Sequence, residues 1–378
     1  MREQINNFSM LKVGTILRGT YRIDSYLSSG GFGNTYLATN IEFEERVAIK
    51  EFFMKGVTQR DDKQTTVSVS NVENQNCFLE QKEKFKKEAR RLRKLKNEHI
   101  VKVHDLFEEN GTAYYVMDYV DGENMAERLK RIGRPMTESE VRLILPQILD
   151  ALKTVHDAGI WHLDLKPANI MVGKGGNVKL IDFGASKQLN AQTGGATTST
   201  AISYTNGYAP REQMEQNYEK FGPWTDIYAL GATLYNLLTN KRPPLPSDID
   251  DEGETAFNFS STMSVQMKEL ILKLMNPNRN KRPQNVDCIT GFKTNNTVGP
   301  NDHLDIKGIN EQIDNEDTIL PQSIPKSIDD GDSLSENKKS DSNISIFQVV
   351  KFIIYYGAVV LISFFGFLFI SLVVANMW

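Results

Sequence analysis

The chain has 378 residues, more than one hydrophobic core usually supports, so we expect one large domain of two lobes with appended segments. Its formal net charge of −4 is uneven, because residues 301–343 carry 11 acidic and 4 basic side chains. The rest is close to neutral, which argues against nucleic-acid binding. The two cysteines, Cys77 and Cys288, form neither a metal-binding spacing nor a disulfide framework and fit a reducing cytoplasm.

The first part of the chain has the pattern of a small sheet. Residues 21–27 alternate in part between apolar and polar side chains, residues 28–33 favour a turn, and residues 46–50 favour a strand. The polar stretch from Thr58 to Asn76 predicts either an insertion or a flexible loop. Strand, glycine turn, strand and strand are therefore expected in this order.

A charged helix is predicted over residues 85–96. Its apolar side chains recur at three- and four-residue spacing, so that one stripe faces a sheet. They are Phe85, Ala89, Leu92 and Leu95. Two strands, over residues 101–107 and 113–119, follow and are joined at Asn110-Gly111, which is a hairpin signal.

The pattern then becomes helical. A helix over residues 137–157 begins with a capping box, since Glu140 follows Thr137 at three residues. Further helices are predicted over residues 226–239 and 264–275. A sheet followed by helices predicts an α+β fold with a small β-rich lobe and a larger α-helical lobe.

Residues 293–350 are predicted to form an acidic disordered tether. They are rich in Asn, Asp, Ser and Gly, and their isolated aliphatic side chains bury too little apolar surface to offset chain entropy. As a flexible coil these 58 residues would span roughly 40 Å root-mean-square. Ser333, Ser335 and Ser342 are candidates for self-phosphorylation, which implies self-association of two copies.

Residues 351–378 are predicted to form a single transmembrane helix. The 27 residues from Phe352 to Trp378 carry no charge and make a helix of roughly 40 Å, longer than the roughly 30 Å hydrocarbon core. Lys338, Lys339 and Lys351 precede this span, which places the preceding part of the chain in the cytoplasm. The alternatives are a buried core helix and a cleaved lipid-anchor signal. The first twenty residues show no signal peptide, which disfavours the second alternative.

The most informative run extends from His162 to Asn169 (HLDLKPAN), and Asp182-Phe183-Gly184 begins thirteen residues after it, a spacing that resembles the catalytic loop and metal-binding turn of protein kinases. Phosphoryl transfer needs one carboxylate at the attacking hydroxyl, a second carboxylate on magnesium, and an amide-type oxygen on the other side of the metal. Asp164 is placed to accept the hydroxyl proton or to orient that hydroxyl, and Lys166 to neutralise the transferred phosphate. Asn169 and Asp182 are the predicted ligands of Mg²⁺.

A second motif lies in the predicted sheet, where glycines would let backbone N–H groups approach the phosphates of ATP. The loop comprises Leu27, Ser28, Ser29, Gly30, Gly31, Phe32 and Gly33. A simple hairpin turn is the alternative. The run from Val47 to Lys50 (VAIK) supports the nucleotide site, because Lys50 would bind the α- and β-phosphates one strand later.

Lys50 needs a carboxylate to hold it in place. Glu88 adjoins the apolar stripe of the predicted helix and is the preferred partner, with Glu80 and Glu83 as alternatives. A surface ion pair between Glu88 and a neighbouring lysine is the other possibility. A pair between Lys50 and Glu88 would make the position of this helix a switch.

These motifs together resemble those of serine/threonine protein kinases over about residues 15–290. The loop form GGFGxTYLA is closest to the bacterial membrane-attached members, and KPAN resembles the serine/threonine-specific sequence. The resemblance implies a bilobal protein-kinase-like fold over residues 15–292, divided near residue 120, after an amino-terminal extension of residues 1–14. It also implies ATP and Mg²⁺ as cofactors and a protein substrate with a serine or threonine hydroxyl.

The resemblance assigns further roles. Ala48 and Met117 belong to the adenine pocket, and the backbone from Asp118 to Val120 binds the adenine edge. Thr205 contacts Asp164 and Lys166 and helps to seat the substrate hydroxyl.

Two roles implied by the resemblance are structural. Glu212 pairs with Arg282 in a buried bridge that fixes the activation segment. Asp226 holds the backbone of the catalytic loop.

One departure concerns the residue before the catalytic aspartate. Most family members have arginine there, which binds phosphate on the activation segment, whereas this chain has Leu163. Leucine cannot bind a phosphate, so activity is expected to depend less on phosphorylation of this segment than in relatives. The hydroxyls in question belong to Thr193, Thr197, Thr198, Ser199, Thr200 and Ser203.

Two other functions fit the pattern less well. A nucleotide-binding pseudokinase that acts as a membrane scaffold is favoured by Ser28, Leu163 and Arg211, which replace usual residues of the family. A small-molecule kinase is disfavoured because the segment around Glu212 resembles that of enzymes with protein substrates. An active membrane-anchored kinase is the leading interpretation, since a scaffold needs none of the catalytic set.

Overall fold

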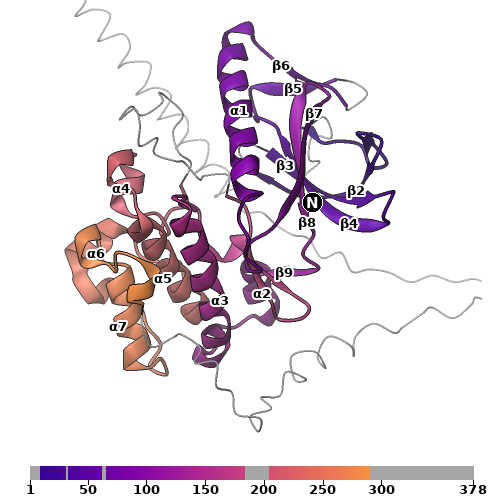
Figure 1. Cartoon of the computed structure of the whole chain (residues 1–378). Coiled ribbons are helices and arrows are strands. Elements are labelled where there is room, and N and C mark those ends of the chain that lie inside the picture. The colour runs from indigo at the N-terminus through magenta and orange to yellow at the C-terminus, as the bar shows by residue number, and fades with distance from the viewer. Residues whose placement is uncertain (1–8, 31–32, 62–64, 184–203, 290–378) are drawn as a thin grey trace, which may run out of the picture. The chain divides into compact units, whose positions relative to one another are not determined.

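The described residues, 9–30, 33–61, 65–183 and 204–289, form a sheet-rich lobe followed by a helical lobe in this computed structural model (Figure 1). This arrangement confirms the predicted α+β bilobal fold. The predicted tether and transmembrane segment lie outside the described residues. Within the described ranges, no helix is both long and apolar enough to cross a bilayer.

The first lobe contains a six-stranded antiparallel sheet in the order β1-β2-β3-β4-β8-β7. Its strands are β1 (Ile16–Leu17), β2 (Tyr21–Gly30), β3 (Gly33–Asn40), β4 (Glu45–Phe52), β7 (Val103–Glu109) and β8 (Thr112–Asp118). The strands predicted from alternation and from the hairpin signal at Asn110-Gly111 are all present. Asn110 and Gly111 both have positive φ, as a tight turn of this kind requires.

The two faces of this sheet have different partners because successive side chains point to opposite sides. On one face, Phe52 and Tyr115 pack against Phe85 of helix α1 (Gln75–Leu92), with ring centroids 5.6 and 4.9 Å apart. Lys50 lies on the same strand as Phe52, two residues away, and therefore shares this face. On the opposite face, Tyr36 and Tyr114 belong to a second buried cluster.

The polar stretch predicted as an insertion or a flexible loop contains regular structure. Strands β5 (Thr58–Arg60) and β6 (Val67–Val69) pair as a hairpin, and the short helix η2 (Val72–Asn74) leads into α1. Helix α1 starts ten residues before the predicted start, because residues 75–84 are too polar to show an apolar stripe although Phe78 is buried among them.

The second lobe is mainly helical. Its helices are α2 (Met125–Ile132), α3 (Glu138–Asp157), α4 (Arg211–Met214), α5 (Pro223–Thr239), α6 (Pro246–Glu252) and α7 (Val265–Leu274), with short helices η3 (Pro167–Asn169), η4 (Tyr218–Lys220), η5 (Gly253–Ala256), η6 (Arg279–Lys281) and η7 (Val286–Cys288). The predicted capping box of α3 is confirmed, since the Glu140 amide donates to Thr137 Oγ1 and the Thr137 amide to Glu140 Oε2. Helix α5 is buried along nearly its whole length.

A small sheet joins the two lobes. Strands β9 (Gly122–Asn124), β10 (Ile170–Gly173) and β11 (Val178–Leu180) form it in the order β11-β10-β9. The Leu180 amide donates to the His99 carbonyl, and the Val101 amide donates to the Leu180 carbonyl, both between residues 79 or more apart in sequence. These bonds place the segment before Asp182 next to residues 99–101, which lie just before strand β7 of the first sheet.

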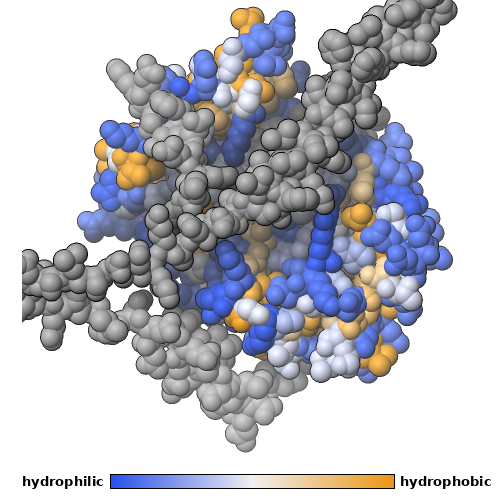
Figure 2. All heavy atoms as spheres, turned by 180° about the vertical axis from the view of Figure 1, so that it is seen from behind, coloured by the Kyte–Doolittle hydropathy of each residue, from blue (hydrophilic) through white to orange (hydrophobic). Residues whose placement is uncertain are grey.

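The surface seen in Figure 2 is mostly hydrophilic over the described residues, with apolar side chains in small groups. Apolar residues gather inside instead, and the largest of their clusters continues from the α1 face of the sheet into the helical lobe. This continuous core holds both halves of the candidate site in one framework.

Candidate active site

The loop between α3 and η3 is held by hydrogen bonds to the buried carboxylate of Asp226 on α5. Its oxygens accept hydrogen bonds from the amides of His162 and Leu163 at 2.9 and 2.8 Å, and from His156 Nε2 at 2.8 Å. Burial opposes the charged form of Asp226, but the bonds from His156 and the backbone outweigh it and hold its pKa below the ordinary value. The predicted role of Asp226 is confirmed.

The backbone turns at Leu163, so that Leu163 is buried whereas the next side chain, Asp164, is partly exposed. The backbone of Leu163 has φ of 61°, a left-handed conformation that a branched side chain adopts only at a cost. Gln213 Nε2 donates to its carbonyl at 2.6 Å, and the side chain packs with Phe221 in an apolar cluster. Leucine is therefore accommodated by packing at the position where the family usually has arginine.

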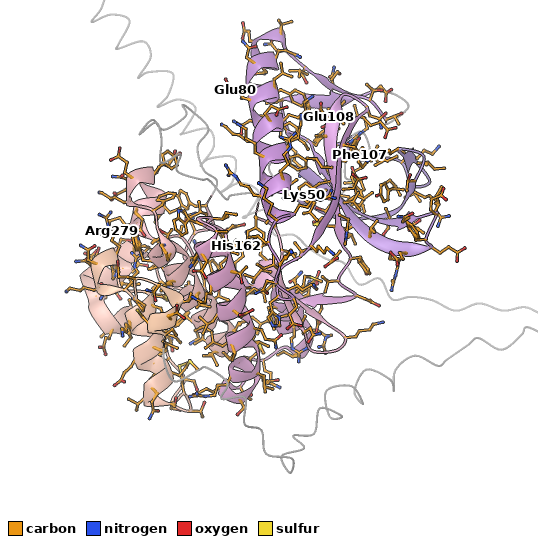
Figure 3. All side chains as sticks on the ribbon, viewed as in Figure 1. Lys50, Glu80, Phe107, Glu108, His162 and Arg279 are labelled. Carbon is orange, nitrogen blue, oxygen red and sulfur yellow. The ribbon has the colours of Figure 1, made fainter. Side chains whose placement is uncertain are left out.

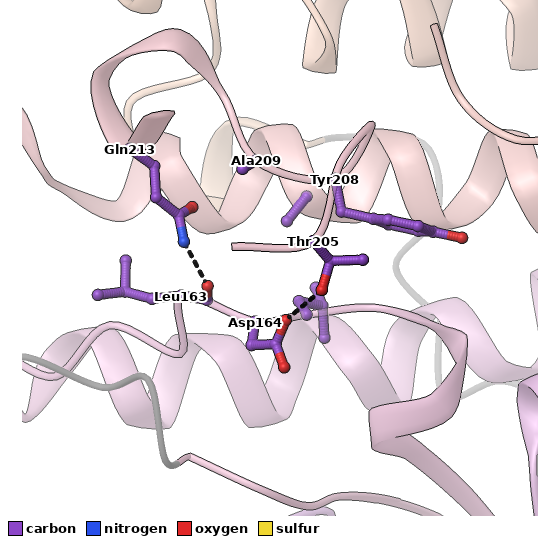
Figure 4. A pocket seen from close by; sticks show the side chains of 8 residues that line it. Leu163, Asp164, Thr205, Tyr208, Ala209 and Gln213 are labelled. Atoms are coloured by element: carbon purple, nitrogen blue, oxygen red, sulfur yellow. Dashed lines mark hydrogen bonds between the residues drawn. The ribbon is translucent and has the colours of Figure 1, made fainter. Parts of the chain in front are cut away.

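Asp164 is the centre of a hydrogen-bonded cluster. Lys166 Nζ lies 2.8 Å from Asp164 Oδ2, and Thr205 Oγ1 donates to Asp164 Oδ1 at 3.0 Å. Lys166 Nζ also donates to Thr205 Oγ1 at 3.0 Å, so the three side chains form a closed triangle. Figure 4 shows Asp164 and Thr205 joined by this hydrogen bond, and both residues line a small pocket together with Tyr208. Three residues predicted from two separate motifs thus meet.

Asn169 and Asp182 have side-chain oxygens that are suited to bind a hard cation. Asn169 Nδ2 donates to the Asp164 carbonyl and to Asp164 Oδ2 at 2.8 and 3.0 Å, which leaves the amide oxygen as its acceptor atom. The Ile181 amide donates to the Asn169 carbonyl at 3.0 Å and so places Asp182 beside this residue. An amide oxygen and a carboxylate are ligands that Mg²⁺ uses together with water and phosphate oxygens.

Lys50 lies between two acidic side chains. Its Nζ is 2.6 Å from Asp182 Oδ1 and 3.9 Å from Glu88 Oε1. Tyr115 donates its hydroxyl to Glu88 Oε1 at 3.4 Å and so holds the Glu88 carboxylate in place. The alternatives lie elsewhere: Glu83 pairs with Lys86 at 2.5 Å, and Figure 3 shows Glu80 farther along α1, away from Lys50.

The charges at Lys50 are strongly coupled. Burial opposes the ammonium form, but the carboxylates of Asp182 and Glu88 outweigh it and hold the pKa of Lys50 well above its ordinary value. Burial raises the pKa of the Glu88 carboxyl, and Lys50 limits this rise. Lys50 therefore stays cationic in the pH range where a phosphate would carry its negative charges.

The predicted glycine loop connects β2 and β3, whose register pairs Gly30 with Gly33. Leu27, Ser28 and Ser29 lie in β2, which ends at Gly30, and Leu27 is half exposed, whereas Gly31 and Phe32 lie outside the described residues. A Cβ atom at Gly33 would collide with the carbonyl oxygen of Glu51, so only glycine allows this close approach of β3 to β4.

The residues assigned to adenine lie at adjoining strand positions. Ala48 pairs with Met117 across β4 and β8, and both side chains are buried. The Asp118 amide donates to the Lys102 carbonyl, and its carboxylate accepts from His104 and Lys179 at 2.6 and 3.2 Å. Val120 follows the end of β8. Their contact with adenine stays a prediction.

The buried pair between Glu212 and Arg282 is confirmed. Arg282 Nη1 and Nη2 donate to the two carboxylate oxygens of Glu212 at 2.7 and 3.2 Å, a bidentate geometry. Arg282 also donates to the carbonyls of Asn276, Trp224 and Pro277. The guanidinium therefore joins α4, the start of α5 and the segment after α7.

The sequence did not identify three supporting residues. His156, Gln213 and Tyr115 each hold a predicted site residue or its loop, through the bonds to Asp226, Leu163 and Glu88 described above. A histidine late in a helix, a glutamine after a loop and a tyrosine in a strand carry no local signal of such a role. Only the meeting of distant segments shows it.

A family model described as "Protein kinase domain" matches residues 21–290. The chain belongs to this family. It is 31% identical to serine/threonine-protein kinase F of Synechocystis over 281 residues, covering 69% of this chain and 52% of the relative. It is also 31% identical to serine/threonine-protein kinase PrkC of Bacillus subtilis over 264 residues, covering 68% of this chain and 34% of the relative.

A solved structure titled "PpkA-294 apo form" is similar to this protein kinase with a TM-score of 0.64 and 26% identity, covering 75% of this chain and 99% of that one. Against full-length relatives the coverage is smaller, since this kinase chain spans between a third and about half of the length of the first curated relatives. The comparison therefore concerns the kinase domain, and the relatives contain further sequence.

Replacing Arg282 by alanine is expected to lower the free energy of unfolding by about 3–5 kcal/mol, because the buried Glu212 carboxylate loses its counter-charge. Denaturant unfolding of the full chain measures this loss. Lys281→Ala is the matched control, since Lys281 is the exposed neighbour and its loss should change stability by less than about 0.5 kcal/mol. Equal effects of the two variants would contradict the assignment.

Proposed function

We propose that this chain is an ATP- and Mg²⁺-dependent serine/threonine protein kinase, anchored to a membrane by residues 351–378 with its catalytic domain in the cytoplasm. The supporting observation is the convergence of Asp164, Lys166 and Thr205 in one cluster, with Asn169 bridging toward Asp182 and Lys50. The bacterial relatives named as serine/threonine kinases support the same substrate class.

In the proposed reaction, the hydroxyl oxygen of a substrate serine or threonine forms a bond to the γ-phosphorus of ATP, and the bond from this phosphorus to the β-γ bridging oxygen breaks. Asp164 orients the hydroxyl and accepts its proton, while Lys166 offsets negative charge on the transferred group. Lys50 binds the remaining phosphates, and ADP leaves. Mg²⁺ held by Asn169 and Asp182 would neutralise phosphate charge during this transfer.

The contact between Lys50 and Asp182 has a consequence for nucleotide binding. At 2.6 Å, Lys50 occupies one oxygen of the carboxylate that is proposed to bind the metal. Phosphates that bind Lys50 would release this oxygen toward Mg²⁺. Nucleotide and metal are therefore expected to bind together more tightly than either alone.

A nucleotide-binding scaffold is the second candidate. Two residues that differ from the usual family residues favour it, because neither needs a phosphate on the activation segment as a partner. Leu163 packs with Phe221, and Arg211 forms an ion pair with Asp250. A scaffold would bind ATP without transferring phosphate. The complete catalytic set favours the active enzyme.

Membrane attachment rests on the composition of residues 352–378, which are uncharged over a length sufficient to span a bilayer. The acidic residues 293–350 would then separate the kinase domain from the membrane. We also propose that two copies associate in one membrane. Each copy could then phosphorylate Ser333, Ser335 and Ser342 in the tether of the other.

Replacing Asp164 by asparagine is expected to lower phosphate transfer about 100- to 10,000-fold, because the amide cannot accept the proton. ATP binding should change little, since Asp164 is proposed to bind the substrate hydroxyl, whereas Lys50 is proposed to bind the phosphates. Transfer of labelled phosphate from ATP to a generic basic protein measures the first quantity, and calorimetric titration with Mg-ATP measures the second. Asp157→Asn, at an exposed carboxylate on α3, is the matched control. Wild-type protein that binds ATP but transfers nothing would favour the scaffold.

Replacing all six activation-segment hydroxyl residues, Thr193, Thr197, Thr198, Ser199, Thr200 and Ser203, by alanine should leave activity within about threefold of wild type. Leu163 offers no charged group to a phosphate on this segment. The rate of phosphate transfer to the basic protein measures the effect. Loss of activity in a folded protein would show that segment phosphorylation is required after all.

Deleting residues 351–378 should release the protein from membranes into the soluble fraction without changing its transfer rate on the basic protein. Fractionation of expressing cells measures this. A variant that lacks residues 301–343 but keeps the apolar segment is the control, and it should stay with the membrane. A truncated chain that remains membrane-bound would contradict the anchor.

A further inference from the structure

A buried polar cluster lies behind the nucleotide-facing side of the first sheet. Its centre is the carboxylate of Glu51, which is fully buried and forms an ion pair with the equally buried Arg60 at 2.6 Å. Tyr36 and Tyr114 donate their hydroxyls to it at 2.9 and 3.0 Å, and Asn34 Nδ2 donates at 3.3 Å. Four donor residues, from strands β3 and β8 and from the inserted hairpin, thus surround one carboxylate.

The position of this cluster in the sheet connects it with the nucleotide site. Glu51 directly follows Lys50 on β4, so its side chain points to the opposite face of the sheet. Asn34 directly follows Gly33, the last glycine of the loop, and is paired with Glu51 in the strand register. The base of the glycine loop is therefore fixed to β4 through its backbone, through the close approach at Gly33, and through the Asn34 side chain.

The cluster is closed by the amino-terminal segment. The Ser9 carbonyl accepts from Asn34 Nδ2 at 2.9 Å and from Arg60 Nη2 at 3.4 Å. The Leu11 amide donates to the Tyr36 hydroxyl at 3.1 Å, and the Leu11 side chain is buried in the core of this face. Residues 9–11, which lie before the start of the matched family region at residue 21, thus bond to three of the side chains that donate to Glu51.

Arg60 comes from the hairpin formed by β5 and β6. Its Nη1 donates to the Thr65 carbonyl at 2.8 Å, and its guanidinium lies 5.3 Å from the centre of the Phe53 ring. Burial and the Glu51 carboxylate raise the pKa of Tyr36 and of Tyr114, so both tyrosines remain hydroxyl donors. A buried carboxylate with this many donors restricts its strand to one position, since any displacement leaves polar groups unpaired.

We propose that residues 9–11 and Arg60 are positioning elements of the nucleotide site. They hold Glu51 and Asn34, the immediate neighbours of Lys50 and Gly33, and so fix the distance between the phosphate-binding lysine and the glycine loop. The amino-terminal segment thereby sets the affinity for ATP although it does not contact the nucleotide. The proposal rests on nucleotide binding by the proposed kinase and not on phosphate transfer itself.

Two truncations of the full chain test this proposal. Deleting residues 1–11 removes the Ser9 carbonyl and the Leu11 anchor, whereas deleting residues 1–8 leaves both in place. The longer deletion should weaken Mg-ATP binding about tenfold relative to the shorter one, as measured by calorimetric titration. In an active enzyme the KM for ATP should rise in parallel, while kcat at saturating ATP should change less than about threefold.

Two further variants separate positioning from general stability. Leu17→Ala truncates a buried side chain in the same core cluster but makes no side-chain bond to Glu51. It should lower the Tm while leaving the dissociation constant of Mg-ATP within about twofold of wild type. Asn34→Ala, should the longer truncation fail to fold, removes only the bonds to Glu51 and Ser9 and should weaken ATP binding about threefold.

The Tm and the affinity for Mg-ATP together distinguish a positioning role from a role in stability alone. A longer truncation, or an Asn34→Ala variant, that lowers the Tm but leaves the affinity for Mg-ATP unchanged would overturn the proposal. So would an equal loss of affinity in Leu17→Ala. Wild-type protein that binds Mg-ATP but transfers no phosphate would refute the proposed enzyme, while the affinity comparison would still decide the role of residues 9–11.

Discussion

The buried carboxylate of Asp226 is the constraint on which the catalytic loop depends. It lies in the middle of the core on α5, where an uncompensated charge is costly, and its compensation comes from two loop amides and from His156. Because these amides belong to His162 and Leu163, the bonds fix the chain immediately before Asp164. A polar group within the helical core thus decides where a side chain at the surface of the site lies.

The two halves of the site meet through charge. Lys50 comes from the first lobe and Asp182 from the segment after β11, and their contact is made in a place where Lys50 is largely buried. Glu88 adds a second carboxylate from α1. The surroundings of the Lys50 ammonium group therefore depend on the positions of helix α1, strand β4 and the segment after β11. Movement of α1 would change the charges around Lys50, the residue proposed to bind the phosphates. The buried cluster at Glu51 restrains the same strand from its other face.

Local signals predicted the elements with strong periodicity or a specific turn residue, and failed where neither was present. The capping box at Thr137 and the turn at Asn110-Gly111 were visible because the responsible side chains are adjacent in sequence. The start of α1 and the hairpin carrying Arg60 were not, since their residues are polar and are ordered by contacts with distant strands. Arg60 lies in the polar stretch predicted to be an insertion or a flexible loop, yet it is the counter-charge of Glu51.

The sequence by itself determined the chemistry proposed for this protein: the carboxylates, amide and lysines of the proposed catalytic set, their order and their spacing are all explicit in the chain. This follows because transfer of a phosphoryl group demands particular functional groups, and such groups are read directly from residue types. Only the tertiary structure decided which carboxylate faces Lys50, that Leu163 packs against Phe221, and that residues 9–11 bond to a buried polar cluster. These depend on burial and on hydrogen bonds between segments far apart in the chain, for which no local pattern exists.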